Sequence, residues 1–307
     1  MYNTAQYLNN FKEQLQTLNY SKSTIDNYLS AINRFLNWLK KENLPDIKSL
    51  TPQTILNYQT HIQNKNYSLS TQHVFLRGIK HFFTYLTQEN QILFNPAAKI
   101  HFPKLGNRLP KHIPTEPEML TILELPRTDT HKGLRDKALL ELLYSTGLRR
   151  QECANLKIAD IDLKDNTVRV NQGKGQKDRI VPLGKTAGEH IKQYILNSRE
   201  HYLKNTTEES LFLNRMGKPL SAAMITIIIR EYRKQAGFNY PFTTHSIRRA
   251  FATHLIKNQA NPLYVQKLLG HTRGETLNRY VKVAALEVKQ THQQTHPRER
   301  GEEEQAC

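Results

Sequence analysis

The chain has 307 residues, which suits two domains of ordinary size, and it carries 44 Lys and Arg against 27 Asp and Glu. The net charge of +17 is spread along the chain, so it favours a polyanionic partner, nucleic acid first, over a merely solvated basic surface. Two cysteines make no disulfide framework or zinc site, the first residues lack a signal-peptide pattern, and no apolar run approaches the roughly 20 residues of a membrane span. We therefore expect a cytoplasmic protein without a membrane segment.

The first 94 residues carry the apolar spacing of four amphipathic helices and predict an all-α bundle. One stripe covers 4–18 and a second covers 25–39. A third helix begins at Thr51-Pro52, a cap followed by proline at the first helical position, and a fourth covers about 70–89. The side chains expected to face the core include Phe11, Leu15, Leu18, Ile32, Phe35, Ile55, Leu56, Ile62, Val74, Ile79, Phe82 and Phe83.

Helical periodicity stops over 95–114, where Pro96, Pro103 and Pro110 lie among basic residues. This composition predicts an extended basic linker between a first domain at 1–94 and a second at 115–290. The last residues, 291–307, show no periodicity, and we expect a disordered tail there.

The second domain opens with predicted helices near 116–125 and 134–144, the latter ended by Gly147. Arg149 then begins a short helix, in which Cys153 is expected to be a small buried residue. The period changes to two over 160–163, 167–170 and 179–183. These segments predict a three-stranded antiparallel sheet, with Lys174 at the tip of its second hairpin.

Further helices are predicted near 186–203, 221–235 and 244–258, and Asn261-Pro262 begins another that ends at Gly270. His271 therefore follows a helix C-terminus, and Tyr280 lies on a last helix near 275–290. The predicted fold class is mainly α with one small antiparallel sheet. His245 and Arg248 are three residues apart, so they share one face of their helix.

Transesterification of a DNA phosphodiester needs cations on the non-bridging oxygens, a nucleophile such as a phenol, a proton acceptor and a general acid for the departing hydroxyl. Taken singly, each candidate has an ordinary explanation: H-x-x-R is usually a surface pair, GKG between strands is usually a turn, and most tyrosines are packed. The joint pattern is different, because arginine, lysine, histidine and tyrosine candidates follow one another in an order that could assemble one site.

The motifs resemble those of the tyrosine recombinases, or phage integrase family. The resemblance rests on TGLRRQE (146–152), GKGQKDRIVPL (173–183), HSIRRAFATHL (245–255), LLGH (268–271) and Tyr280, which occur in the family's order and at similar spacing. The bundle resembles the family's core-binding, SAM-like domain, so the resemblance covers the whole chain. It implies a C-terminal catalytic domain and an enzyme that cuts and rejoins DNA without a metal, nucleotide or other cofactor.

The same resemblance implies a role for each matching residue. The nucleophile would be Tyr280, making a 3′-phosphotyrosyl bond, and the clamp on the scissile phosphate would be Arg149 and Arg248. His245 would be the general base or a phosphate ligand. His271 would donate a hydrogen bond to a non-bridging oxygen, and Lys174 would be the general acid for the 5′-hydroxyl. Glu152 would orient Arg149, whereas His254 is expected to be a packing residue.

The sequence departs from the family pattern at Ile247, Arg249 and Ala250 and in TRGETLNR before Tyr280. It is most similar to the Xer group or to a compact integrase. This similarity implies a nucleoid-associated homo- or hetero-tetramer that binds double-stranded recombination sites, and a recombination reaction that proceeds through a Holliday junction. Two alternatives are a type IB topoisomerase, disfavoured by the bundle and the motif spacing, and a catalytically silent architectural DNA-binding protein, disfavoured because all six motif residues are present.

Overall fold

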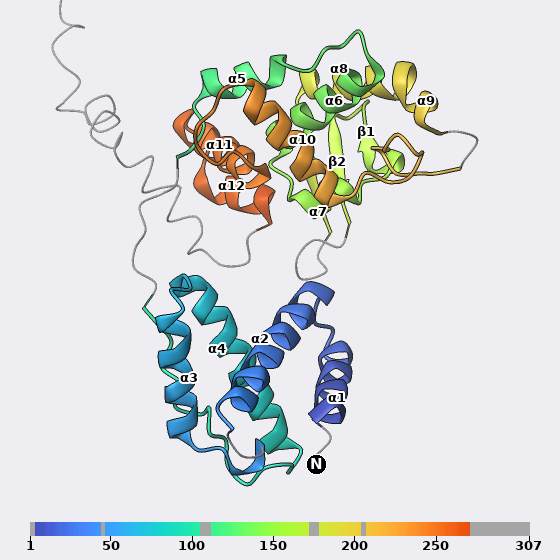
Figure 1. The fold of residues 1–307 in the computed structure, drawn as a ribbon. Coiled ribbons are helices and arrows are strands. Elements are labelled where there is room, and N and C mark those ends of the chain that lie inside the picture. The colour runs from blue at the N-terminus through green and yellow to red at the C-terminus, as the bar shows by residue number, and fades with distance from the viewer. Residues whose placement is uncertain (1–3, 44–46, 105–111, 172–177, 204–206, 271–307) are drawn as a thin grey trace, which may run out of the picture. The chain divides into compact units, whose positions relative to one another are not determined.

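The computed structural model describes residues 4–43, 47–104, 112–171, 178–203 and 207–270. The chain divides into two compact units, 1–109 and 110–307 (Figure 1). No helix among the described residues is long and apolar enough to cross a membrane. Lys174, His271, Tyr280 and the predicted helix at 275–290 lie outside the described residues.

The first unit contains the four predicted helices: α1 (Thr4–Thr17), α2 (Lys22–Lys41), α3 (Pro52–Asn64) and α4 (Leu69–Gln88), with a short 3₁₀ turn η1 (Ile47–Ser49) before α3. Ser21, Thr51 and Ser68 cap α2, α3 and α4 with their side-chain oxygens, which satisfies backbone N–H groups that a helix start leaves unpaired. The helices α2 and α4 lie side by side (Figure 1). The aromatic rings of Phe11, Phe35 and Phe82 are buried in the core of the unit.

Three residues predicted to face this core are exposed instead: Leu18 (59%), Leu56 (45%) and Val74 (43%). Leu18 follows the last residue of α1, so it leaves the helical stripe. Leu56 lies one position, about 100° of helix rotation, from Ile55, and the buried face of α3 follows Ile55, Tyr58 and Ile62.

The segment expected to be an extended linker begins as part of the first unit. Ala97 and Ile100 are buried in its core, and Nε2 of Gln59 donates a hydrogen bond of 2.9 Å to the carbonyl of His101. Local turns after Asn95 bring these apolar residues back onto the helices, a packing that the loss of periodicity did not reveal.

The second unit is helical around one small sheet. Its helices are α5 (Glu116–Glu124), α6 (His131–Thr146), α7 (Arg150–Ala154), α8 (Lys185–Tyr194), α9 (Glu200–Leu203), α10 (Ala222–Gln235), α11 (Thr244–Lys257) and α12 (Pro262–Leu269). A π-helical segment η3 (Ile195–Arg199) joins α8 to α9, where the sequence predicted one continuous helix, and a 3₁₀ turn η2 (Ile158–Asp160) precedes the sheet.

The three strands are β1 (Ile161–Asp162), β2 (Thr167–Val170) and β3 (Arg179–Pro182), antiparallel in the order β1-β2-β3, as predicted. Val168 pairs with Val181, and both are buried in the core that the sheet shares with α6 and α8. Ile180 points the other way and is 65% exposed, as the two-residue period of a strand requires. The inward face of β3 therefore carries Arg179 and Val181.

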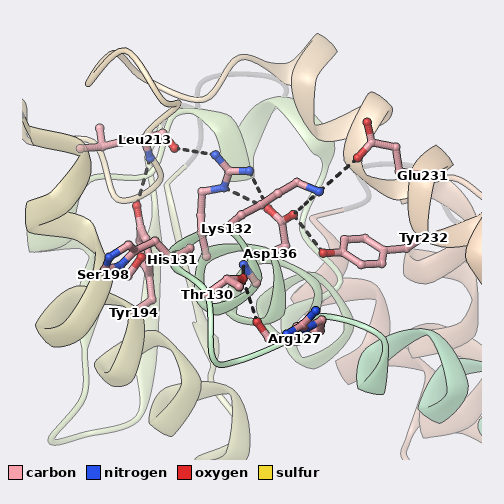
Figure 2. Close-up of polar contacts among 12 residues, drawn as sticks. Arg127, Thr130, His131, Lys132, Asp136, Tyr194, Ser198, Leu213, Glu231 and Tyr232 are labelled. Atoms are coloured by element: carbon pink, nitrogen blue, oxygen red, sulfur yellow. Dashed lines mark hydrogen bonds and ion pairs between the residues drawn. The ribbon is translucent and has the colours of Figure 1, made fainter.

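A buried polar network joins α6 to α10 and to the segment around Leu213 (Figure 2). The Asp136 carboxylate is fully buried and accepts hydrogen bonds from the Arg135 guanidinium at 2.8 and 2.9 Å and from the Tyr232 hydroxyl at 3.1 Å. Arg135 also donates to the carbonyl of Leu213 at 3.2 Å. Because a buried charge needs a partner, this network fastens three elements that lie far apart in the sequence.

Candidate active site

Arg149 owes its position to the way α6 ends. Gly147 adopts the left-handed conformation (φ 60°) and closes α6, and after one further residue Arg149 is the N-cap of α7. Glu152, three residues on, accepts a hydrogen bond of 2.8 Å from the backbone N–H of Arg149 and another of 2.6 Å from its Nη1. The TGLRRQE motif thus folds locally into a turn that holds Arg149 and Glu152 together.

Glu152 also binds a second arginine, which the sequence did not single out. Nη1 and Nη2 of Arg179 donate to the two carboxylate oxygens at 3.0 and 2.8 Å, the side-by-side geometry of a bidentate ion pair. The Glu152 side chain is 7% exposed, and burial alone would raise its pKa. The hydrogen bonds from Arg179 and from the Arg149 backbone outweigh burial and lower the pKa of Glu152 to about 2.

The C-terminus of α12 is held by three arginines. Nε of Arg179 donates to the carbonyl of Leu268 at 2.9 Å, Nη2 of Arg248 to that of Leu269 at 2.5 Å, and Nη2 of Arg149 to that of Gly270 at 3.0 Å. Carbonyls in the last turn of a helix have no intrahelical partner, and the helix dipole makes this end partly negative, so cations are favoured there. Arg149, Arg179 and Arg248 are thereby brought together from three separate parts of the chain.

Arg248 is the most deeply placed of the three, with 4% of its surface exposed. It lies on α11, and its Nη1 donates to the carbonyl of Gly147 at 2.6 Å. Phe251 and Ala252 on α11 pack against Val265 and Leu269 on α12, which keeps the two helices in place around this guanidinium. The sequence motifs at 146–152 and 245–255 therefore meet in one site.

His245 lies in the first turn of α11, which Thr243 caps, and it is exposed. Partial removal of its ring from water lowers the pKa of His245, and the charges of Arg249, Arg248, Arg150 and Arg149 lower it further. Both effects favour the neutral imidazole, the form that can accept a proton. His245 and Arg248 are three residues apart on α11, so they are neighbours on that helix.

His254 and Cys153 are buried, as predicted. His254 is 7% exposed, and a hydrogen bond of 2.8 Å joins its Nδ1 to the Tyr144 hydroxyl. Cys153 is 1% exposed, and burial raises the pKa of its thiol, so it is an inert packing residue. Among the described residues, no group of three His, Cys, Asp or Glu side chains is arranged to hold a metal ion.

Arg179 is the site residue that motif reasoning missed, although it lies within the quoted stretch 173–183. A signal was present in the two-residue period of β3, which puts Arg179 on the same face as the buried Val181. A charged side chain on the inward face of a strand requires a buried partner. The position of that partner, Glu152, could not be read from the spacing.

The same chain shows clear similarity to known proteins. Residues 114–287 match the phage integrase family, and residues 7–92 match the N-terminal SAM-like domain of phage integrases. The chain belongs to the phage integrase family. Its relatives include the tyrosine recombinase XerD of Staphylococcus epidermidis, 41% identical over 204 residues that cover 66% of this chain and 68% of XerD. The tyrosine recombinase XerC 2 of Ralstonia nicotianae is 38% identical over 208 residues, 68% of this chain and 60% of that protein.

The family member described here is a Xer-like tyrosine recombinase, an enzyme that performs site-specific DNA recombination. Its fold is shared with the XerH site-specific recombinase bound to a palindromic difH substrate, with a TM-score of 0.73 and 22% identity over 94% of this chain and 85% of that one. In this recombinase the three guanidinium charges of Arg149, Arg179 and Arg248 and the single carboxylate charge of Glu152 leave a net charge of +2, which suits an anionic phosphodiester.

Proposed function

We propose that this recombinase cuts and rejoins DNA strands through a covalent 3′-phosphotyrosyl intermediate formed by Tyr280. The phenolic oxygen attacks the phosphorus of the scissile phosphodiester, the P–O5′ bond breaks, and the 5′-oxygen takes up a proton as it leaves. The 5′-hydroxyl of a second strand then attacks the phosphotyrosine, which restores a phosphodiester and frees Tyr280. The number of phosphate esters is unchanged in each step, so no energy source is consumed.

The observation that carries this proposal is the arginine cluster at the end of α12. Arg149 and Arg248 are held by backbone carbonyls that are adjacent in the chain, so their guanidiniums are fixed in direction before any DNA binds. Fixed cations stabilise the charge that develops on the non-bridging oxygens without reorganising during the reaction. They are the proposed clamp on the scissile phosphate.

The remaining roles are assigned to residues that follow the family motifs. His245 accepts the phenolic proton or binds the phosphate, and its lowered pKa supports the neutral form that a base needs. Lys174 supplies the proton to the 5′-oxygen, and His271 donates a hydrogen bond to a non-bridging oxygen. Glu152 acts through Arg149, as their two hydrogen bonds support.

The proposed substrate is a pair of double-stranded DNA sites held by a homo-tetramer or by a hetero-tetramer with a related recombinase. Two rounds of strand exchange then proceed through a Holliday junction. Support comes from the XerD and XerC relatives and from the net charge of +17. Acting on chromosomal DNA would place the protein in the cytoplasm, at the nucleoid.

The proposal is tested by covalent capture. The protein is incubated with a pool of nicked duplexes in which two randomised arms flank a spacer, because a nick lets the short 5′ fragment diffuse away and traps the adduct. Trapped DNA is sequenced and the DNA-linked peptide is identified by mass spectrometry. We expect enrichment of one site and a phosphate linkage on the peptide that contains Tyr280. No adduct, or one on another residue, would refute the proposed mechanism.

Plasmid relaxation separates this proposal from a type IB topoisomerase. A supercoiled plasmid that lacks the captured site is expected to stay supercoiled, whereas a topoisomerase would relax it efficiently. The same plasmid carrying two copies of the site is expected to yield recombinants. Efficient relaxation without the site would favour the topoisomerase.

A further inference from the structure

Arg179 has partners in two separate elements. Its guanidinium binds the Glu152 carboxylate of α7 through two hydrogen bonds and the Leu268 carbonyl of α12 through Nε. It also packs on Gly270, where an added Cβ would lie 3.3 Å from Nη1 of Arg179. One side chain on β3 therefore fastens the first turn of α7 to the last residues of α12.

Arg149 is attached to the same two places. It binds Oε1 of Glu152 at 2.6 Å, the oxygen that Arg179 also contacts, and it binds the carbonyl of Gly270 at 3.0 Å. The Arg149 side chain is 23% exposed and that of Arg179 is 13% exposed, so Arg149 is the outer guanidinium of the pair. Among the described residues, the Arg149 side chain donates hydrogen bonds through Nη1 and Nη2. A guanidinium has five N–H groups, so others remain to donate to an anion that approaches from solvent.

We propose that Arg179 is a positioning residue for DNA strand cleavage, which holds Glu152 and the end of α12 in register so that the Arg149 guanidinium is aimed at the scissile phosphate. Without Arg179, the only partner left to the Glu152 carboxylate among the described residues would be Arg149, and the carboxylate could turn with it. A clamp that must be reoriented after DNA binds is slower than one already in place. This role rests on the proposed function, because Arg179 acts through Arg149 and does not touch the DNA.

A guanidinium is needed for this task, and a lysine ammonium cannot replace it. The three contacts of Arg179 lie in different directions, two on a carboxylate and one on a carbonyl, and a planar fork with five N–H groups reaches all three at once. An ammonium keeps the charge beside Glu152 but loses the fixed orientation. Arg179→Lys therefore tests orientation apart from charge, and Arg179→Met removes both.

The experiment measures single-turnover formation of the covalent adduct on the captured site, together with DNA affinity and thermal unfolding. We expect Arg179→Met to slow cleavage by about 100-fold, the cost of a ~1 Å misplacement of a catalytic group, with DNA affinity within about threefold of wild type. Arg179→Lys should lie between Arg179→Met and wild type. The structural control is Arg199→Met, which removes an arginine that binds only the carbonyls of 208, 210 and 211 among its described contacts, and which should lower thermal stability without slowing cleavage by the folded protein.

A double-mutant cycle decides whether Arg179 acts through Arg149. If it does, adding Arg179→Met to Arg149→Lys should slow cleavage by less than about threefold beyond the slower single variant, because their effects are coupled. If the fold-reductions in cleavage rate of the two single variants multiply in the double variant, Arg179 acts independently of Arg149 and the proposed positioning role is overturned. Unchanged cleavage in both Arg179 variants would also overturn it. If Arg179→Met does not fold, the cycle is run with Arg179→Lys. Failure of the wild-type protein to form any adduct would instead refute the proposed function.

Discussion

The carbonyl of Gly147 accepts a hydrogen bond of 2.6 Å from Nη1 of Arg248, which lies 101 residues further along the chain. Gly147 has φ +60°, and its carbonyl is directed at Arg248 because α6 ends there in the left-handed conformation. The glycine of the TGLRRQE motif therefore positions two arginines: Arg149, which follows it by two residues, and Arg248, which its carbonyl binds. Its substitution is the first test of the site.

Gly147→Ala is expected to destabilise the second unit by about 2–4 kcal/mol, from the left-handed backbone and from overpacking. The new Cβ would lie 2.4 Å from Cδ1 of Phe251, so α11 must move. The matched control is Gly237→Ala, with φ +70° and nothing within 4 Å of its Cβ, which should cost only about 1 kcal/mol. Urea unfolding followed by circular dichroism measures both, and the fluorescence of Trp38, the single tryptophan, reports the first unit separately. Equal losses of unfolding free energy in the two variants would contradict the predicted clash with Phe251.

The sequence predicted most of the fold because its signals are local. The cap at Thr51 and the helix end at Gly147 have short-range chemistry, and the structure confirms both of them. The misplaced residues Leu56 and Val74 show the limit of a local pattern. Periodicity predicts that a helix has an apolar face, but packing against neighbouring helices determines which residues at the edge of that face are buried.

The site was predictable only where its residues belong to recognisable motifs. Arg149 and Arg248 were named from the sequence, and the structure brings them to adjacent carbonyls of α12. The carbonyls themselves carry no side-chain signal, so their part in holding the arginines could not be read. Arg179 and Glu152 are 27 residues apart in different elements, and only the fold brings them together. The predicted roles of Lys174, His271 and Tyr280 remain predictions.

The pH dependence of cleavage should follow His245. A base works only in its neutral form, and the lowered pKa keeps His245 neutral to more acidic pH, so the rate should fall only as pH drops below that pKa. Arg249→Gln removes a charge that disfavours the imidazolium, so the pKa should rise and the acid limb should move to higher pH. The rate of adduct formation, measured at sub-saturating DNA from about pH 5 to 8, reports the pKa of this group in the free enzyme. The control is Arg230→Gln, which removes a positive charge from an exposed position on α10 and should leave the acid limb of the pH profile in place. A shift of that limb toward lower pH in Arg249→Gln would exclude His245 as the base.

The buried network of the second unit should matter for stability and not for chemistry (Figure 2). Asp136→Asn leaves the Arg135 charge buried without its carboxylate and should cost about 3–5 kcal/mol. Tyr232→Phe removes a single hydrogen bond of 3.1 Å and should cost about 1 kcal/mol. Denaturant unfolding compares the two, and cleavage per folded molecule should match wild type in both. Similar losses of stability in the two variants would mean that the Arg135–Asp136 pair is not the centre of the network.

Tyr280→Phe should abolish the covalent adduct and leave DNA binding within about threefold of wild type, because the substitution removes one hydroxyl and no cation that contacts phosphate. The matched control is Tyr264→Phe, since Tyr264 is an exposed tyrosine on α12, close in sequence to the site, and its loss should not affect adduct formation. Both variants are measured on the captured nicked site, with binding followed at several salt concentrations. Binding should weaken steeply with salt and with the same slope in all three proteins, since the phosphate contacts are unchanged. An adduct that persists in Tyr280→Phe would assign the nucleophile to another residue, and an adduct lost in Tyr264→Phe would place the attacking phenol on α12.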